Sequence, residues 1–224
     1  MTTARAQLAM DKLMDAAERL YAEHGFAAVS MRQISDAAGQ HNKSVVQYHF
    51  NSRDELIKAI VHRHLQPFQE YRTALMAELV DKPDVSLRDR VSCLVLPSVL
   101  HNIDLGSPSW HARFMAQALV EPTLREYTIQ AHTHDPDSRT RPELDAMIRQ
   151  LVVHMCAELE YDLAHRRIAA SAAESSWHRL GDRLVTAVCG MWIEFHGPAP
   201  ANNAAVHELT TPFRGTTIMK IQYI

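Results

Sequence analysis

The sequence predicts an all-α protein, in which an N-terminal three-helix domain with a helix-turn-helix arrangement precedes a larger helical domain. Apolar residues recur at intervals of three and four through most of the chain, which is the helical period, and only seven of 224 residues are glycine. No alternating pattern typical of strands occurs before residue 200. The expected boundaries are 1–52 for the first domain, 53–197 for the second and 198–224 for an irregular tail.

The first two predicted helices follow from an apolar stripe and a capping motif. The first helix carries its stripe at i, i+3, i+4, i+7 and i+8 and should end at Gly25, where a C-terminal glycine cap belongs. Ser30 and Gln33 have the spacing of a capping box and should begin a short second helix that ends at Gly39. The residues of the stripe are Leu13, Ala16, Ala17, Leu20 and Tyr21.

The next segment, "AGQHNKSVVQYHF", indicates a short third helix with Asn42 as its N-cap. Ser52 and Glu55 form a second capping-box pattern, which should begin a long fourth helix at about residue 53. Proline removes a backbone hydrogen bond and clashes within a helix, so we expect this helix to be bent or broken near Pro67.

The remaining helices are expected over 86–103, 108–120, 122–131, 143–168 and 174–196, with Pro97, Pro108 and Pro122 marking bends or starts. A polar connector is predicted over 132–142. The helix over 174–196 carries an apolar stripe close to a coiled-coil seam, and its length favours a subunit interface over packing in the chain's own core. The stripe consists of Trp177, Leu180, Leu184, Val188, Met191 and Phe195.

Composition excludes several classes of protein. No apolar run reaches the roughly 18 residues that a membrane span requires, and the N-terminus has no secretory signal pattern, so a cytoplasmic protein without membrane association is expected. Three cysteines lie far apart in apolar surroundings and predict reduced core residues. The net charge is −3, divided into +1 over residues 1–65 and −4 over the remainder, which leaves only a small local asymmetry.

Two short helices joined through Gly39 form an arrangement in which the second helix can enter the DNA major groove. Lys43 can donate to guanine, Ser44 can pair with either kind of base edge, and Val45 can touch a thymine methyl group. Polar side chains suited to phosphate or base contacts follow at Gln47, Tyr48 and His49, although His49 could instead bond to a helix end. Arg32 and Arg53 add positive charge on either side.

The linked motifs "AEHGF", "VSMRQISDAAG" and "YHFNSRDELIKAI" make residues 8–62 resemble the N-terminal DNA-binding domain of the tetracycline-repressor (TetR) family of transcriptional regulators. The resemblance implies base-reading roles for Arg32 and for Lys43 to Val45, and phosphate contacts for Gln47, Tyr48 and Arg53. It also implies a helical ligand-binding and dimerisation domain, with residues 143–196 forming a bundle between two subunits. The family usually has tyrosine where Gln47 stands, and the turn "GQHNKS" is one residue longer than usual, which leaves open which of residues 41–43 faces the bases.

The second domain offers candidates for an effector pocket, because such pockets are mostly apolar with a few polar groups. These candidates are Trp110, His111, Phe114, Met115, Met147 and Met155, each of which could instead be a core residue. His132, His134 and Asp135, and likewise His62 and His64, have metal-ligand chemistry but lack a second ligand pair at fixed spacing. No metal site and no cofactor are predicted.

The sequence therefore predicts a ligand-responsive transcriptional regulator rather than an enzyme. As the resemblance implies, it would be a repressor that binds a palindromic double-stranded operator as a homodimer and is released by a small apolar or amphipathic effector. No catalytic motif of the nucleotide-binding, α/β-hydrolase or zinc-protease type occurs, which argues against an all-helical enzyme. A helical protein–protein adaptor is the other alternative, and it would lack salt-dependent DNA binding.

Overall fold

The structure, a computed structural model, describes residues 4–40, 44–125, 127–128 and 142–196. All of the regular structure in these residues is helical, which confirms the predicted all-α fold class. The irregular tail, the 132–141 part of the connector, and residues 126 and 129–131 of the helix predicted over 122–131 lie outside the described residues. The helices are α1 (Ala4–His24), α2 (Met31–Ala37), α3 (Val45–Phe50), α4 (Arg53–Val80), α5 (Leu87–Leu105), α6 (His111–Val120), α8 (Pro142–Ala164), a 3-10 turn (Ala170–Ala172) and α9 (Ala173–His196).

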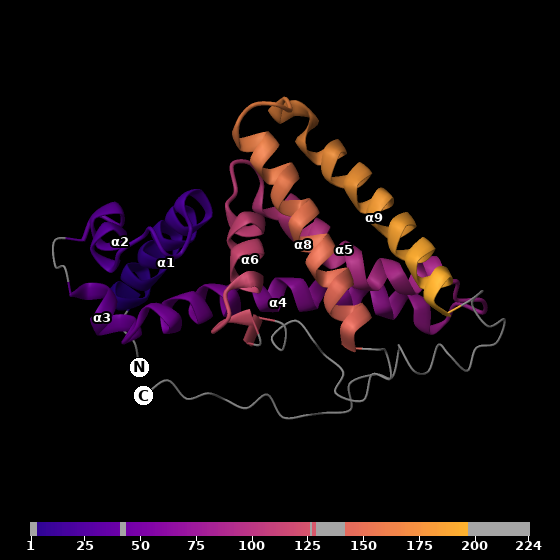
Figure 1. The fold of residues 1–224 in the computed structure, drawn as a ribbon, viewed down its shortest axis with the longest axis horizontal. Helices are drawn as coiled ribbons and strands as arrows, with labels where there is room; N and C mark the ends of the chain where they lie inside the picture. The colour runs from indigo at the N-terminus through magenta and orange to yellow at the C-terminus, as the bar shows by residue number, and fades with distance from the viewer. Residues whose placement is uncertain (1–3, 41–43, 126, 129–141, 197–224) are drawn as a thin grey trace.

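The helices form two groups that α4 connects (Figure 1). Helices α1, α2 and α3 gather around the first turns of α4, and the remainder of α4 packs against α5. Helix α6 stands between the two groups and contacts both α1 and α8. The connection between the groups therefore depends on α4 and α6.

The end of α1 and the start of α2 lie at the predicted residues. Gly25 follows α1 with φ +84°, a left-handed conformation that costs glycine little. The capping box of α2 is complete, because the Gln33 amide donates to Ser30 Oγ at 3.3 Å while the Ser30 amide donates to Gln33 Oε1 at 2.9 Å. Gly39, with φ +69°, follows the end of α2. Local hydrogen bonding thus fixes the positions of the two helices that precede α3.

Helix α4 begins as predicted, but it is not broken at Pro67. Ser52 Oγ accepts from the amide of Glu55 at 3.1 Å, whereas the Glu55 carboxylate pairs with Lys58 rather than completing the box. The helix is continuous from Arg53 to Val80, so of the bend or break expected near Pro67 the break does not occur. His64 and Phe68, on either side of this proline, are buried, and their packing offsets the roughly 3 kcal/mol that proline costs inside a helix.

The N-terminal core extends beyond residue 52 and includes parts of two later helices. Leu13, Tyr21, Ile34 and Phe50 from α1, α2 and α3 pack with Ile60 and its neighbours in the first turns of α4. Phe114 and Ala118 of α6 belong to the same cluster. One face of α6 is therefore part of the core of the N-terminal domain.

A second core lies between α5, α8 and α9. Trp177, Leu184 and Val188 of α9 are buried there against residues of α5 and α8, so this part of the predicted seam is intramolecular packing and not a subunit interface. Gly181 permits the approach of α9 to α5, since a β-carbon at that position would lie 3.1 Å from Leu96 Cδ2. Among the described residues, no helix combines the length and apolar character needed to cross a membrane.

Candidate functional site

Helix α3 divides its side chains between the core and the solvent. Val46 and Phe50 are buried, while Gln47 and Tyr48 point outward, and Tyr48 is 81% exposed. The Gln47 side chain donates to the backbone carbonyl of Asn51, which holds it along the outer face. This exposed polar face has the character expected of a helix that enters the DNA major groove.

Val45 is a correction to the sequence analysis. It is only 9% exposed and packs in the N-terminal core, so it cannot touch a thymine methyl group as predicted. The N-cap of α3 is Ser44, whereas Asn42 was expected. Ser44 itself is exposed next to the outer face.

The other predicted DNA-contacting residues surround this face. Arg32 on α2 is exposed and pairs loosely with Asp36, the Nε to Oδ2 distance being 3.8 Å. His49 is half-buried and its ring stands edge-on to Tyr48, with centroids 5.0 Å apart. Arg53 donates from Nη1 to the carbonyl of Phe26 at 3.2 Å, so part of its guanidinium is used inside the domain. Lys43 lies outside the described residues.

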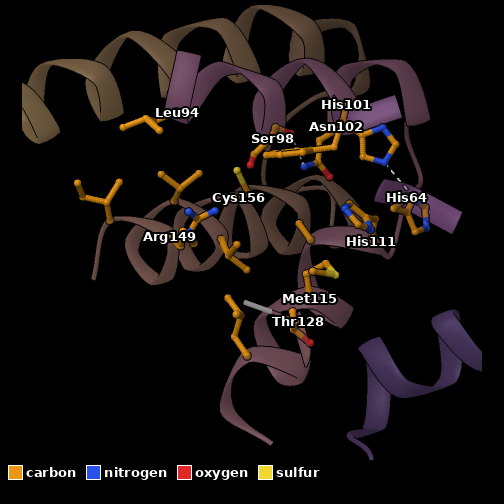
Figure 2. Close-up of a pocket in the computed structure, with 16 residues that line it drawn as sticks. His64, Leu94, Ser98, His101, Asn102, His111, Met115, Thr128, Arg149 and Cys156 are labelled. Carbon is orange, nitrogen blue, oxygen red and sulfur yellow. Dashed lines mark hydrogen bonds between the residues drawn. The ribbon is translucent and has the colours of Figure 1, made fainter. Parts of the chain in front are cut away.

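A cavity lies in the second domain between α4, α5, α6 and α8 (Figure 2). The cavity is partly open to solvent. Apolar side chains from α4, α5, α6 and α8 form most of its wall, and the polar groups include His64, His101, Asn102 and Arg149. An apolar cavity with a few polar groups is the usual form of a small-molecule site.

Only two of the six predicted pocket residues line this cavity, namely His111 and Met115. Phe114 is buried in the N-terminal core and Trp110 packs against it, so both face away from the cavity. Met147 and Met155 are 41% and 40% exposed and lie on the outer side of α8. The other four residues do not line this cavity, because neighbouring positions on α6 and α8 face different surroundings.

The lining residues from α4 and α5 were not predicted from the sequence. His64 was considered only as a metal ligand next to His62, and His101 and Asn102 were not singled out. Asn102 is 3% exposed; its Nδ2 donates to the Ser98 carbonyl at 2.8 Å, while its Oδ1 has no hydrogen-bond partner within the described ranges. The sequence signal for these lining residues was a histidine followed by an asparagine in an otherwise apolar helix. Polar side chains that are buried in this way require hydrogen-bond partners.

Helix α6 is held in place by a buried carboxylate from α8. The helix has no side-chain cap of its own, and Glu160 of α8 instead accepts from the backbone amides of Ala112 and Arg113 at 3.2 and 3.0 Å. The same carboxylate accepts from Ser109 Oγ at 2.8 Å and from Arg113 Nε at 3.0 Å. A negative charge at a helix N-terminus is favourable, so Glu160 fixes α6 relative to α8.

Ion pairs connect α1 with α4. Arg63 on α4 donates to Asp15 at 2.6 Å and also to Glu18, which is buried on α1. His64 Nε2 lies 3.1 Å from Glu18 Oε1. Burial alone would raise the pKa of Glu18, but the hydrogen bond with His64 and the Arg63 guanidinium outweigh it and hold that pKa below its usual range. Glu18 is therefore an ionised acceptor between the two groups of helices.

The fold and the exposed face of α3 define a protein of the helix-turn-helix class with a second helical domain. Residues 13–60 match the family described as bacterial regulatory proteins, tetR family. The matched segment extends from α1 into the first turns of α4 and so covers most of the N-terminal helix-turn-helix domain, which is similar to that family.

The curated relatives agree with this assignment. Two uncharacterized HTH-type transcriptional regulators from two strains of Mycobacterium tuberculosis are 33% identical to this chain over 81 residues, which is 36% of this chain. The matched segment spans 40% of the length of each relative.

Among solved structures, a putative TetR-family regulator from Rhodococcus sp. aligns with a TM-score of 0.45 at 16% identity, over 79% of this chain and 98% of its own. The TetR family regulator PfmR from Thermus thermophilus aligns with a TM-score of 0.44 at 20% identity, over 83% and 97% of the two chains.

Proposed function

We propose that this chain is a ligand-responsive transcriptional repressor that binds a palindromic DNA operator as a homodimer. The observation that carries the proposal is the outer face of α3, where Ser44, Gln47 and Tyr48 are exposed on a TetR-type domain. Side chains of this kind donate to phosphates and to base edges. Lys43 is proposed as a base contact and Arg53 as a phosphate contact, as the resemblance implies. The cytoplasmic location expected from the sequence stays a prediction.

The effector is proposed to be a small apolar or amphipathic molecule that occupies the cavity. Support comes from the two faces of α6: His111 and Met115 line the cavity, while Phe114 and Ala118 pack in the N-terminal core. A molecule in the cavity would contact α6, the same helix that packs against α1. Its differential affinity for two positions of α6 would alter DNA binding, which is the requirement for allosteric release.

The homodimer is proposed to form through the outer faces of α8 and α9, within residues 143–196. The stripe from Trp177 to Val188 is buried within the chain, but Met147, Met155 and Ile193 are large apolar side chains with 40% to 48% of their surface exposed. A partner subunit would remove these side chains from water. Two DNA-binding domains would then contact two half-sites and combine their affinities.

Genome-fragment capture tests this function. The purified chain is mixed with fragmented genomic DNA at two salt concentrations, and the fragments that stay bound are sequenced. Enrichment of one palindrome, with affinity that falls steeply as salt rises, is expected because phosphate contacts release counterions. No enrichment at either salt concentration would contradict DNA binding and favour the adaptor alternative.

Light scattering of the wild type and of Ile193→Arg tests the dimer, which the added charge should weaken.

A further inference from the structure

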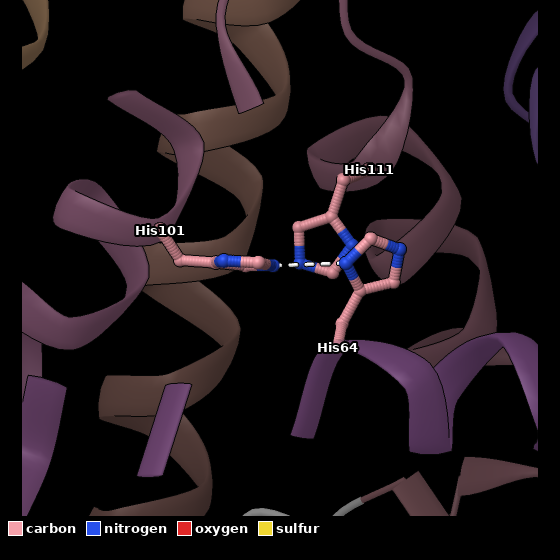
Figure 3. A group of neighbouring side chains, drawn as sticks. All are labelled: His64, His101 and His111. Atoms are coloured by element: carbon pink, nitrogen blue, oxygen red, sulfur yellow. Dashed lines mark hydrogen bonds between the residues drawn. The ribbon is translucent and has the colours of Figure 1, made fainter. Parts of the chain in front are cut away.

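We propose that His64, His101 and His111 form a binding site for a transition-metal ion of the zinc class at the junction of the two groups of helices. The three residues come from α4, α5 and α6, and all three are buried. Their rings converge on one another in Figure 3. Each offers a ring nitrogen, and these atoms all lie within 4.8 Å of one another.

The distances are close to those of a metal centre. His64 Nδ1 lies 2.8 Å from His101 Nε2, and the ring of His111 lies 4.0 Å from that of His64 and 4.9 Å from that of His101, between centroids. Zinc–nitrogen bonds are about 2.0 to 2.1 Å long, so two ligands of a tetrahedral ion stand roughly 3.3 Å apart. Small side-chain rotations would therefore bring the three nitrogens to coordinating distance without a change in the helices.

Glu18 is placed to select the His64 tautomer that a metal ligand needs. In that tautomer His64 Nε2, 3.1 Å from Glu18 Oε1, donates its hydrogen to the carboxylate. In the neutral ring, Nδ1 then has its lone pair directed at His101 Nε2. A histidine that donates one N–H to a carboxylate and binds metal through the other nitrogen is the usual arrangement around zinc, and here Arg63 holds the carboxylate.

The ligand set selects the class of ion. Three neutral imidazoles suit Zn²⁺, Co²⁺, Ni²⁺ or Cu²⁺, whereas Mg²⁺ and Ca²⁺ require oxygen ligands. All three histidines line the cavity, so the fourth coordination position would face the space proposed for the effector. A water molecule or a donor atom of the effector would occupy that position.

The site lies where a bound ion would influence the DNA-binding domain. The ion would tie α4, α5 and α6 together, and Glu18 would connect it to α1 through His64. Fixing these helices would favour one arrangement of the N-terminal domain over others. This regulatory consequence rests on the proposed function, whereas the metal site itself does not.

The test is titration of the full chain, without a polyhistidine tag, with Zn²⁺ in the presence of a competing chelator and in the absence of DNA. One equivalent of Zn²⁺ is expected to bind, with loss of binding in His101→Gln and in His111→Gln. Glu18→Gln should weaken binding tenfold to a hundredfold, as is usual for residues that orient a ligand. Far-ultraviolet circular dichroism establishes that each variant keeps its helical fold.

His62→Gln is the matched control, because His62 is exposed on the same helix as His64. A second control, His132→Gln with His134→Gln, addresses the other histidine pair in the chain; both controls should keep one equivalent. Substitution with Co²⁺ should give the intense visible absorption of a four-coordinate ion in the wild type. Failure of the unaltered chain to bind Zn²⁺, or unchanged binding in His101→Gln and His111→Gln, would overturn the proposal.

These measurements distinguish a failure of the proposed metal site from a failure of the proposed DNA-binding function. Zn²⁺ binding is measured without DNA, and operator binding is measured with chelator present and then with Zn²⁺ added. Operator binding that does not respond to Zn²⁺, by a chain that binds one equivalent, would leave the metal site standing and remove only its regulatory role. Zn²⁺ binding by a chain that captures no palindrome would overturn the proposed function alone.

Discussion

Gln117 of α6 donates a 2.7 Å hydrogen bond from Nε2 to the backbone carbonyl of Tyr21 in α1. The same carbonyl accepts from the amide of Gly25 at 2.9 Å, where α1 ends. The residue that follows Gly25, Phe26, packs its ring edge-on against Phe114 of α6 with centroids 5.7 Å apart. A polar bond and an aromatic contact thus join α6, which lines the cavity, to the C-terminal end of α1.

Replacing Gln117 with methionine should lower the free energy of unfolding by about 1 kcal/mol, the usual net worth of one hydrogen bond. The Tyr21 carbonyl keeps its bond from Gly25, so a larger loss is not expected. Urea denaturation of the wild type and Gln117→Met measures the difference. Gln150→Met, on the exposed side of α8, is the control, and equal losses in the two variants would show that the bond to Tyr21 contributes nothing.

Local hydrogen-bonding patterns made the N-terminal domain predictable. Ser30 and Gln33 are three residues apart, and both bonds of the capping box form between them. Gly25 and Gly39 likewise carry their own signal, because few other residues tolerate positive φ. The start of α3 was less predictable, because Asn42 was expected as the N-cap whereas Ser44 stands at that position without a side-chain cap bond.

The cavity could not be predicted in this way because long-range packing builds it. His64 and His101 are 37 residues apart and meet through the packing of α4 on α5. Phe114 and Met115 are adjacent and both apolar, yet Phe114 belongs only to the N-terminal core while Met115 also lines the cavity. Periodicity identifies the apolar side of a helix but not which of two neighbouring cores each residue enters.

Tyr48 and Val45 should respond in opposite ways to replacement by alanine. Tyr48→Ala removes an exposed side chain from the proposed DNA face, so operator affinity should fall while the free energy of unfolding stays within about 0.5 kcal/mol of wild type. Val45→Ala leaves a small core cavity and should destabilise the fold by roughly 2 kcal/mol. Fluorescence anisotropy with labelled operator and urea denaturation measure the two quantities. Unaltered operator affinity in Tyr48→Ala would contradict the proposed role of the α3 face.

Glu160→Gln should destabilise the protein by about 3 kcal/mol, because breaking a buried ion pair leaves Arg113 without its counter-charge. The change also weakens the cap of α6, so this helix should lose hydrogen-exchange protection more than α9 does. Glu158→Gln, exposed on the same helix, is the control and should have little effect. Equal stability of the two variants would mean that Glu160 does not hold α6 in place.

The three cysteines should react with iodoacetamide in a fixed order in the native protein. Burial raises the pKa of Cys156 to about 12 and that of Cys93 to about 11, so almost no thiolate is present at neutral pH. The pKa of Cys189 is also raised by burial, but this thiol is only half-buried and should react first. Mass spectrometry of peptides from timed samples gives the order. Early modification of Cys156, which lines the cavity, would indicate that the cavity wall opens readily.

Asp89 should make a contribution to stability that disappears in acid. A hydrogen bond from Lys82 Nζ at 2.7 Å lowers the pKa of Asp89, and further bonds from the Ser86 hydroxyl and amide act in the same direction against a smaller effect of burial. A carboxylate whose pKa is lower in the folded state stabilises the fold above its unfolded pKa of about 4, and this contribution is lost as pH falls through the folded value.

Asp89→Asn should therefore cost about 1 kcal/mol at pH 7, typical of a lost helix cap, and the difference from wild type should shrink below a pH of about 4. Urea denaturation of both proteins from neutral to acidic pH provides the comparison. Asp84→Asn removes an exposed carboxylate three residues before the start of α5 and serves as the control. The difference in free energy of unfolding between wild type and Asp89→Asn could instead be constant over the whole pH range. The charge of Asp89 would then not be what stabilises this helix, and hydrogen bonding by its neutral side chain would be.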